Sequence, residues 1–222
     1  MCGRFTLRTP ASDLAQRFEL DALPEIPPRY NIAPTQPVMT IRSTPEERSA
    51  SLLRWGLIPS WARDTSMSSR MINARSETVH QKPAFRKAFA QRRCLIIADG
   101  FFEWQGQGRQ KQPFSIALHS GEAFAFAGLW ETWQAPDGSV LESCTILTTE
   151  PNERIKPIHD RMPVILDPDA YACWLDPAEH KPQRLLPLLQ PYPADAMDVY
   201  PVHPYVNNTR HQDARCIAPM TL

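Results

Sequence analysis

The sequence predicts an α+β fold with a sheet or barrel core. Short apolar and aromatic runs typical of strands dominate the 222 residues, and helical patterns are inserted between them. Prolines are abundant, at 23 against 8 glycines, which indicates many short elements joined by stiff connections and argues against a helical bundle. No repeat, low-complexity tract or composition shift divides the chain, so we expect one domain over residues 1–222.

The first part of the chain is expected to form a helix and then a hairpin. A helix is predicted over Thr9–Leu20, because Pro10 suits the first helical position and an acidic residue follows in the first turn. Arg29–Pro34 is expected to be a turn-bearing loop. Val38–Ser43 and Ser51–Trp55 are expected to pair as strands around a polar turn.

The remainder is expected to alternate strands with short helices. Pro83–Arg93 is predicted to be a basic helix with one apolar face, and Gly106–Gln112 to be a hairpin turn. Helices that begin at a proline are expected over Asp167–Trp174 and Pro177–Leu189. Further strands are predicted at Cys94–Ala98, Gly100–Trp104, Phe114–Leu118, Ala123–Leu129, Ser143–Leu147 and Val199–Val206.

Composition and charge narrow the class of protein. Lys plus Arg equals Asp plus Glu at 24 each, so a nucleic-acid partner would need a local basic patch. The five cysteines are scattered, which indicates a reduced, cytoplasmic protein. They have no CxxC spacing, so we expect no metal site, and no cofactor is expected either. The N-terminus lacks a signal-peptide pattern, and no apolar run approaches the ~20 residues that span a membrane. Gly-rich phosphate loops and the GxSxG motif are missing.

The opening stretch MCGRF suggests a specific chemistry. The small side chain of Cys2 would let an aminopeptidase remove Met1, and Cys2 would then carry a free α-amine and a thiol on adjacent carbons. Such an aminothiol condenses with an aldehyde, first to an imine and then to a five-membered thiazolidine. The alternative is an ordinary cysteine near a frayed terminus.

Three further segments hold polar residues in apolar surroundings. In GFFEW, desolvation would raise the pKa of Glu103 and suit it to acid–base catalysis, although a water-facing strand position fits equally well. His159, in IHDRMP, suits either a proton shuttle or a surface turn. In INAR, Asn73 would orient a reacting group and Arg75 would hold a phosphate, unless both belong to a salt-bridged loop.

Two tryptophans flank the irregular segment GLIPS. Trp55 and Trp61 are either core residues or stacking platforms for bases. We expect the side chain of Trp55 to lie in the core. Exposure is expected of Trp61, because polar residues follow it.

Together these segments resemble the SRAP family, whose name stands for SOS response-associated peptidase. The resemblance depends on the order and combination of motifs, and it extends to about residue 208, which places the domain core at about 2–208. The matching segments are MCGRF (1–5), RYNIAP (29–34), WGLIPSW (55–61), INARSET (72–78), ADGFFEW (98–104), IHDRMP (158–163) and HPYVNN (203–208).

The resemblance implies a distorted antiparallel β-barrel with peripheral helices that recognises abasic sites in single-stranded DNA. It implies a monomer, associated with the nucleoid when bound, that forms a protective DNA–protein crosslink in the DNA damage response. Cys2 matches the family nucleophile, and Asn73, Glu103 and His159 match the other catalytic positions. The residues implied to lie at the DNA are Gly3, Arg4, Arg75, Trp55 and Trp61. Other candidates for a basic patch are Arg70, Arg86, Lys87, Arg92 and Arg93.

Two alternatives belong to other functional classes. The family name suggests a peptidase in which Cys2 attacks the carbonyl ahead of it, with Glu103 or His159 as the base. A noncovalent module for single-stranded DNA is the other alternative. Cys2→Ala separates the crosslinker from the module, because a module would keep its full function.

Overall fold

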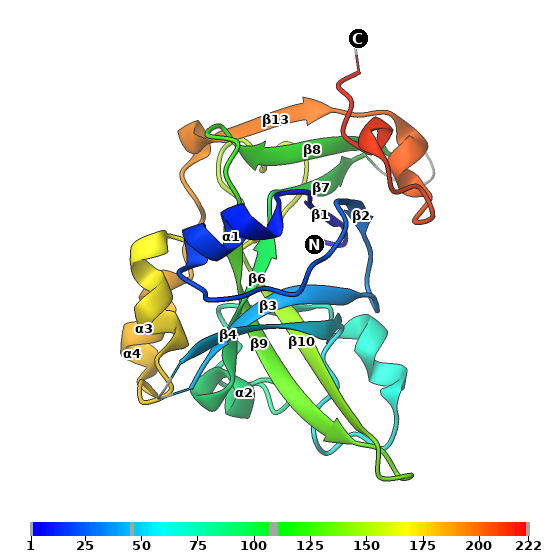
Figure 1. Ribbon diagram of the computed structural model, residues 1–222. Helices are drawn as coiled ribbons and strands as arrows, with labels where there is room; N and C mark the ends of the chain where they lie inside the picture. Colours follow the sequence, from blue (N-terminus) through cyan, green and yellow to red (C-terminus); the bar gives the residue numbers. More distant parts are fainter. Residues whose placement is uncertain (1, 45–46, 107–110, 221–222) are drawn as a thin grey trace.

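The centre of the molecule is a closed ring of strands, shown in the lower part of Figure 1. The structure is a computed structural model that describes residues 2–44, 47–106 and 111–220. In the ring each strand pairs with the next, and the last strand pairs with the first. In pairing order the ring strands are β3 (Pro37–Ser43), β4 (Arg48–Trp55), β10 (Val140–Thr149), β9 (Phe124–Gln134) and β6 (Arg93–Ala98). All of these pairings are antiparallel except the one between β4 and β10, which is parallel. Short strands β5 (Asn73–Arg75), β11 (Met162–Pro163) and β12 (Ile165–Leu166) extend it.

A second sheet lies above the ring in Figure 1. Its order is β13 (Met197–Pro201), β8 (Gln112–Leu118), β7 (Gly100–Gln105), β1 (Phe5–Leu7) and β2 (Arg29–Ile32). The helices are short: α1 (Ala11–Phe18), α2 (Arg86–Gln91), α3 (Tyr171–Leu175) and α4 (Pro182–Leu185). The 3-10 turns are η1 (Thr65–Arg70), η2 (Pro168–Ala170), η3 (Leu186–Leu188), η4 (Ala194–Ala196), η5 (Pro204–Asn207) and η6 (Ala214–Cys216). The predicted α+β class with a barrel core is confirmed.

Several predicted elements differ from the structure. Residues 29–32 form strand β2 rather than a loop, because they pair with β1. The strand predicted over Val199–Val206 ends at Pro201, and Pro204 begins a 3-10 turn instead. The basic helix over Pro83–Arg93 shortens to α2, because Arg93 already belongs to β6. Part of the turn predicted over Gly106–Gln112, and Met1 itself, lie outside the described residues.

Aromatic packing joins the two sheets through β1. The Phe5 ring centroid lies 5.1 Å from that of Trp55 on β4 and 5.8 Å from that of Phe126 on β9. Phe126 in turn contacts Phe101 of β7 at 6.0 Å. These side chains are fully buried, and T-shaped aromatic contacts add to the free energy gained from burial. The segment that begins with Cys2 therefore enters the molecule between the ring and the second sheet.

Asp99 holds the other end of β1. Its buried carboxylate accepts hydrogen bonds from the Thr6 hydroxyl, from the backbone N–H of Arg8 and from both the N–H and the hydroxyl of Thr9, while the Arg8 side chain lies 3.2 Å away. Because Asp99 stands between β6 and β7, it joins the ring, the second sheet and the start of α1.

We expect Asp99→Ala to lower the free energy of unfolding by on the order of 3 kcal/mol, because several buried donors would lose a charged acceptor. Urea titration followed by circular dichroism measures the effect. Asp195→Ala, at an exposed turn, serves as the control and should change it by less than about 0.5 kcal/mol. Equal stability of the two variants would contradict this role of Asp99.

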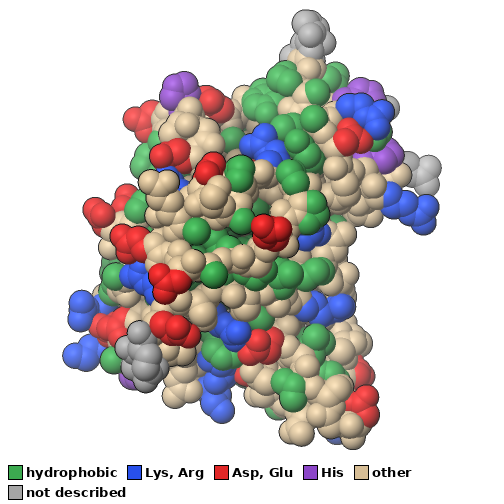
Figure 2. Space-filling view, in the orientation of Figure 1, with side chains coloured by type: hydrophobic (Ala, Val, Ile, Leu, Met, Phe, Trp, Pro, Cys, Tyr) green, Lys and Arg blue, Asp and Glu red, His purple; other side chains and the backbone are tan. Residues whose placement is uncertain are grey.

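Acidic side chains gather on the face that carries α1 and α3, at the left of Figure 2. The exposed acids there and on the adjoining loops are Asp13, Glu19, Asp21, Glu122 and Asp169. This face would repel a phosphate backbone. Among the described residues, no helix is both long and apolar enough to cross a bilayer.

Candidate active site

The pairing of β1 with β7 brings Cys2 and Glu103 together. Phe5 lies opposite Phe101, and the Phe102 N–H donates to the Arg4 carbonyl at 2.9 Å. Continued antiparallel register places half-buried Gly3 opposite Glu103, next to Cys2. The two predicted catalytic residues therefore meet although they are a hundred positions apart in the chain.

Asn73 fixes the Cys2 backbone from the ring side. It begins β5, which pairs in parallel with Ile146 of β10. Its amide Nδ2 donates to the Cys2 carbonyl at 2.8 Å. Its Oδ1 is buried and has no hydrogen-bond partner in the part of the chain that the structure describes. A buried amide oxygen without a partner is costly, and here it offers an acceptor beside Cys2.

Glu103 has the chemistry of an acid–base catalyst. Glu103 lies between Phe102 and Trp104 on β7 and is only 2% exposed. Burial is the main cause that raises the pKa of Glu103 to about 7. At neutral pH the carboxyl is therefore populated in both protonation states, as proton transfer in both directions requires.

The Cys2 side chain is a protonated thiol rather than a thiolate. Its sulfur is fully buried, and its S–H donates to the Arg4 carbonyl at 3.8 Å. Burial raises the pKa of Cys2 far above its ordinary value, and the charge of Glu103 adds to the rise. A reaction that begins at the sulfur would need the proton to be removed first.

His159 approaches from the loop between β10 and β11. The Gln105 side chain at the end of β7 donates to the Pro157 carbonyl at 2.9 Å, which ties this loop to the strand that carries Glu103. Nδ1 of His159 accepts a hydrogen bond from the Arg161 N–H at 3.0 Å. Partial burial lowers the pKa of His159, so the neutral ring is favoured.

The two predicted phosphate ligands, Arg75 and Arg4, differ in how far their guanidinium groups are engaged by the protein. Arg75, at the end of β5, is exposed, and no hydrogen bond or ion pair within the described residues engages its guanidinium. Arg4 donates to the Asn31 side chain at 2.8 Å and to the Val206 carbonyl at 3.0 Å, and it lies over the Trp104 ring. The Arg4 guanidinium is therefore largely engaged within the protein, and Arg75 is the better candidate for a phosphate ligand.

The two candidate tryptophans, Trp55 and Trp61, differ in solvent exposure. Trp61 is 58% exposed on the loop before η1, and Trp133 anchors this loop by donating to the Ala62 carbonyl at 2.7 Å. Trp55 is fully buried and donates to the Ile72 carbonyl at 2.8 Å, next to Asn73. The expectation that Trp55 contacts DNA is wrong, because no surface of its ring is accessible.

Two of the five further candidates for a basic patch, Arg92 and Arg93, are engaged within the protein, whereas Arg70, Arg86 and Lys87 are exposed. Arg93 is buried and donates to backbone carbonyls that include those of Phe89 and Trp174, and Arg92 pairs with Glu131 at 2.7 Å. Both guanidinium groups are held inside the protein, so neither is available to a phosphate. Within the described residues, no group of His, Cys, Asp or Glu side chains could hold a metal.

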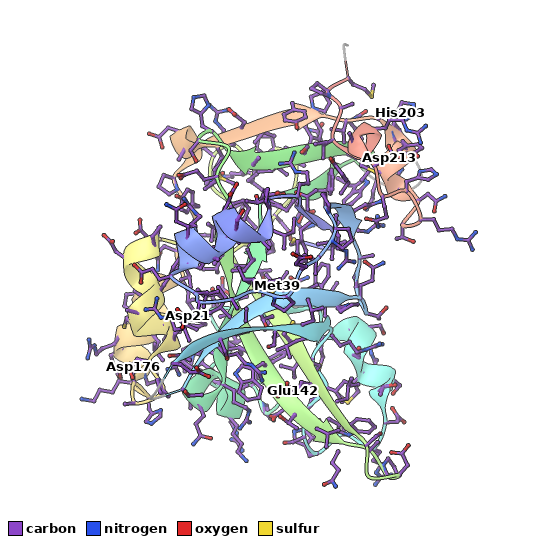
Figure 3. All side chains as sticks on the ribbon, in the orientation of Figure 1. Asp21, Met39, Glu142, Asp176, His203 and Asp213 are labelled. Carbon is purple, nitrogen blue, oxygen red and sulfur yellow. The ribbon has the colours of Figure 1, made fainter. Side chains whose placement is uncertain are left out.

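Asn31 was not recognised from the sequence, although RYNIAP contains it. It is fully buried, and its amide donates to the carbonyls of Val206, Asn208 and His211. Asn31 thereby holds the C-terminal segment against Arg4 and β2. Figure 3 labels the ends of that segment, His203 and Asp213, above β2.

The comparisons with known proteins decide the family. A family model described as SOS response associated peptidase (SRAP) matches residues 1–209. The chain belongs to the SRAP family. The abasic site processing protein YoqW of Bacillus subtilis is 46% identical over 221 residues, which cover 98% of this chain and 99% of YoqW.

More distant similarities cover the same span of the chain. The abasic site processing protein HMCES of Rattus norvegicus is 32% identical over 273 residues, which cover 100% of this chain and 77% of HMCES. A crystal structure of a protein from Bacteroides thetaiotaomicron is 26% identical and superposes with a TM-score of 0.86, covering 99% of this chain and all of that one. The resemblance to the SRAP family seen in the sequence is confirmed.

Proposed function

We propose that this SRAP protein recognises abasic sites in single-stranded DNA and captures the open sugar aldehyde with Cys2 after Met1 is removed. The observation that carries the proposal is the contact of Asn73 with the Cys2 carbonyl, beside a buried Glu103 whose pKa is about 7. The names of YoqW and HMCES, both abasic site processing proteins, support the same substrate. The protein would act as a cytoplasmic monomer.

Capture begins with opening of the sugar ring. An abasic deoxyribose is mostly a closed hemiacetal, and only its open form presents an aldehyde. The Arg161 N–H lies within hydrogen-bond distance of Nδ1 of His159. In the neutral tautomer that accepts this bond, the ring proton is on Nε2, from which it would assist ring opening at the sugar oxygen. The free α-amine of Cys2 has a reference pKa of about 7.7–8.0, so a substantial fraction is unprotonated and nucleophilic.

The amine adds to the aldehyde before the thiol does. Attack of the amine on C1′ gives a carbinolamine. Protonated Glu103 would then donate a proton to the carbinolamine hydroxyl, which leaves as water. The thiol of Cys2 then adds to the imine carbon, and Glu103 would carry the S–H proton to the nitrogen. One carbon–nitrogen and one carbon–sulfur bond form, and one water is lost overall. The raised pKa of Cys2 supports this order, because the thiol alone is a poor nucleophile.

Arg75 and Trp61 are the exposed residues that would contact the DNA. Arg75 supplies an exposed guanidinium at the end of β5, two residues after Asn73. Trp61 supplies an exposed aromatic surface on which a base would stack. The acidic surface around α1 disfavours approach from that side.

The peptidase alternative is less well supported by the geometry. Cysteine peptidases use a thiolate with a low pKa, whereas burial moves the pKa of Cys2 in the opposite direction. Removal of Met1 in the variant Glu103→Gln distinguishes the peptidase activity from crosslinking. If that variant loses Met1 as the wild type does, removal of Met1 does not depend on this site.

The decisive test is an intact mass of the protein after incubation with a single-stranded oligonucleotide that carries one abasic site. We expect a species equal to the protein without Met1 plus the oligonucleotide minus one water. Protein that has lost Met1 but leaves the oligonucleotide unmodified would overturn the proposal. A duplex carrying the same site tests the preference for single strands.

Trp61→Ala is expected to weaken noncovalent binding to an undamaged single strand by about tenfold, because one stacking platform is lost. Its melting temperature should stay unchanged, since the ring is exposed. Trp55→Ala should instead lower the free energy of unfolding by about 3–5 kcal/mol. Fluorescence anisotropy measures the binding, and Leu52→Ala, another exposed apolar residue, is the control. Equal binding by Trp61→Ala and the control would contradict the stacking role.

A further inference from the structure

The loop that carries His159 is fixed at its backbone. The Asn152 side chain accepts from the Ile155 N–H at 3.1 Å, and the His159 N–H donates to the Ile155 carbonyl at 2.9 Å. These bonds form a single helical turn that ends at His159. They set the position of its backbone but leave open which ring nitrogen carries the proton.

Arg161 connects this loop to the segment after Arg75. Its guanidinium donates to both carboxylate oxygens of Glu77, at 2.6 and 2.9 Å, and to the Thr148 carbonyl at 2.6 Å. The same Thr148 carbonyl accepts from the Ser76 N–H at 2.9 Å. The Arg161 side chain is only 14% exposed, so the pair is more protected from solvent than an ordinary surface ion pair.

Two groups compete for Nδ1 of His159. The Arg161 N–H lies 3.0 Å away and needs an unprotonated Nδ1, whereas the Asp160 carboxylate lies 2.9 Å away and needs a protonated one. A neutral ring satisfies only one of them. The Asp160 side chain is 86% exposed and is well solvated without the ring, which favours the bond from Arg161.

We propose that Arg161 is a positioning residue for His159: its two-point contact with Glu77 aims the Arg161 N–H at Nδ1 and so keeps the ring proton on Nε2. Loss of the contact would let the loop relax, and Asp160 would then draw the proton to Nδ1. The consequence for capture rests on the proposed function, because Nε2–H is the donor assigned there to ring opening. The tautomer itself does not depend on it.

The test compares Glu77→Gln and Arg161→Lys with the wild type. Neither variant can form the same charged two-point contact. Glu122→Gln is the matched control, because it removes a carboxylate that pairs with Arg17 at 2.9 Å away from this loop. Nitrogen-15 NMR of the histidine rings, assigned with His159→Gln, reports the tautomer above the pKa of His159. Single-turnover capture of an abasic oligonucleotide reports the rate.

We expect Nε2–H in the wild type and the control, and a shift toward Nδ1–H in both Glu77→Gln and Arg161→Lys. Capture by these two variants should slow by about tenfold, a partial loss of acid–base assistance. An unchanged tautomer in both variants would overturn the inference, as would Nδ1–H in the wild type. If the wild type forms no crosslink, the proposed function fails, while the NMR comparison still decides the role of Arg161.

Discussion

Cys2→Ala is expected to reduce the yield of stable crosslink by a factor on the order of 1,000, because its N-terminal amine has no adjacent thiol to close the ring. The amine can still form an imine, which hydrolyses or promotes cleavage of the strand. Borohydride, which reduces an imine to a stable amine, should therefore recover a crosslink in the variant. Denaturing gel electrophoresis with and without borohydride measures both species.

A matched cysteine shows that the effect belongs to position 2. Cys173 is a partly exposed thiol on α3, and Cys173→Ser should capture the abasic site at the wild-type rate. Cys2→Ser keeps a nucleophile of similar size, but its oxygen ring is expected to be less stable than a thiazolidine. A heat-stable crosslink in Cys2→Ala without borohydride would exclude ring closure by the thiol.

The contrast between thiol and amine explains why the site lies at the start of the chain. Cysteines buried elsewhere, such as Cys94 and Cys144, also have a raised pKa, but they have no free amine beside the thiol. Burial disfavours the Cys2 thiolate, and in the proposed capture the α-amine would make the first bond. The fold contributes by inserting β1 between the two sheets, where Asn73 and Glu103 meet it.

Local sequence patterns predicted the elements that depend on local contacts. The hairpin of β3 and β4 follows from two alternating runs around a polar turn. Strand β2 was mistaken for a loop, because its partner β1 lies more than twenty residues away and its own four residues end near a proline. The length of β9 and β10 was also underestimated, since their pairing continues through polar residues such as Glu131 and Thr132.

Motif order identified the candidate site better than charge did. Arg92 and Arg93 look like a basic surface in sequence, yet Glu131 and backbone carbonyls occupy them in the fold. The family resemblance implied that Trp55 faces DNA, but its ring is fully buried in the core and donates to the Ile72 carbonyl. The partners Glu77 and Arg161 are far apart in sequence, so no spacing rule could have joined them.

Glu103→Gln is expected to slow capture by about 100- to 10,000-fold, the usual loss when an acid–base group is removed. In the wild type the rate should change around pH 7, where the Glu103 carboxyl titrates. Glutamine does not titrate, so the variant should lose that feature and keep only the dependence on the α-amine and His159. Single-turnover rates between pH 5 and pH 9 would show both effects. A feature near pH 7 that survives in the variant would assign it to another group.

The Glu103 carboxyl should also make the free energy of unfolding depend on pH. Because burial raises the pKa of Glu103 from its ordinary 4.5 to about 7, folding favours the protonated form. Its contribution is fully present below about pH 4.5 and is lost as the pH rises through 7, a difference worth about 3 kcal/mol. Glu103→Gln should therefore match the wild type near pH 4 and exceed its stability near pH 9. Urea titrations at both pH values measure the difference. A variant that is less stable at pH 9 would mean that the ionised carboxylate is held favourably, and Glu103 would then not be the proton carrier proposed for both steps of capture.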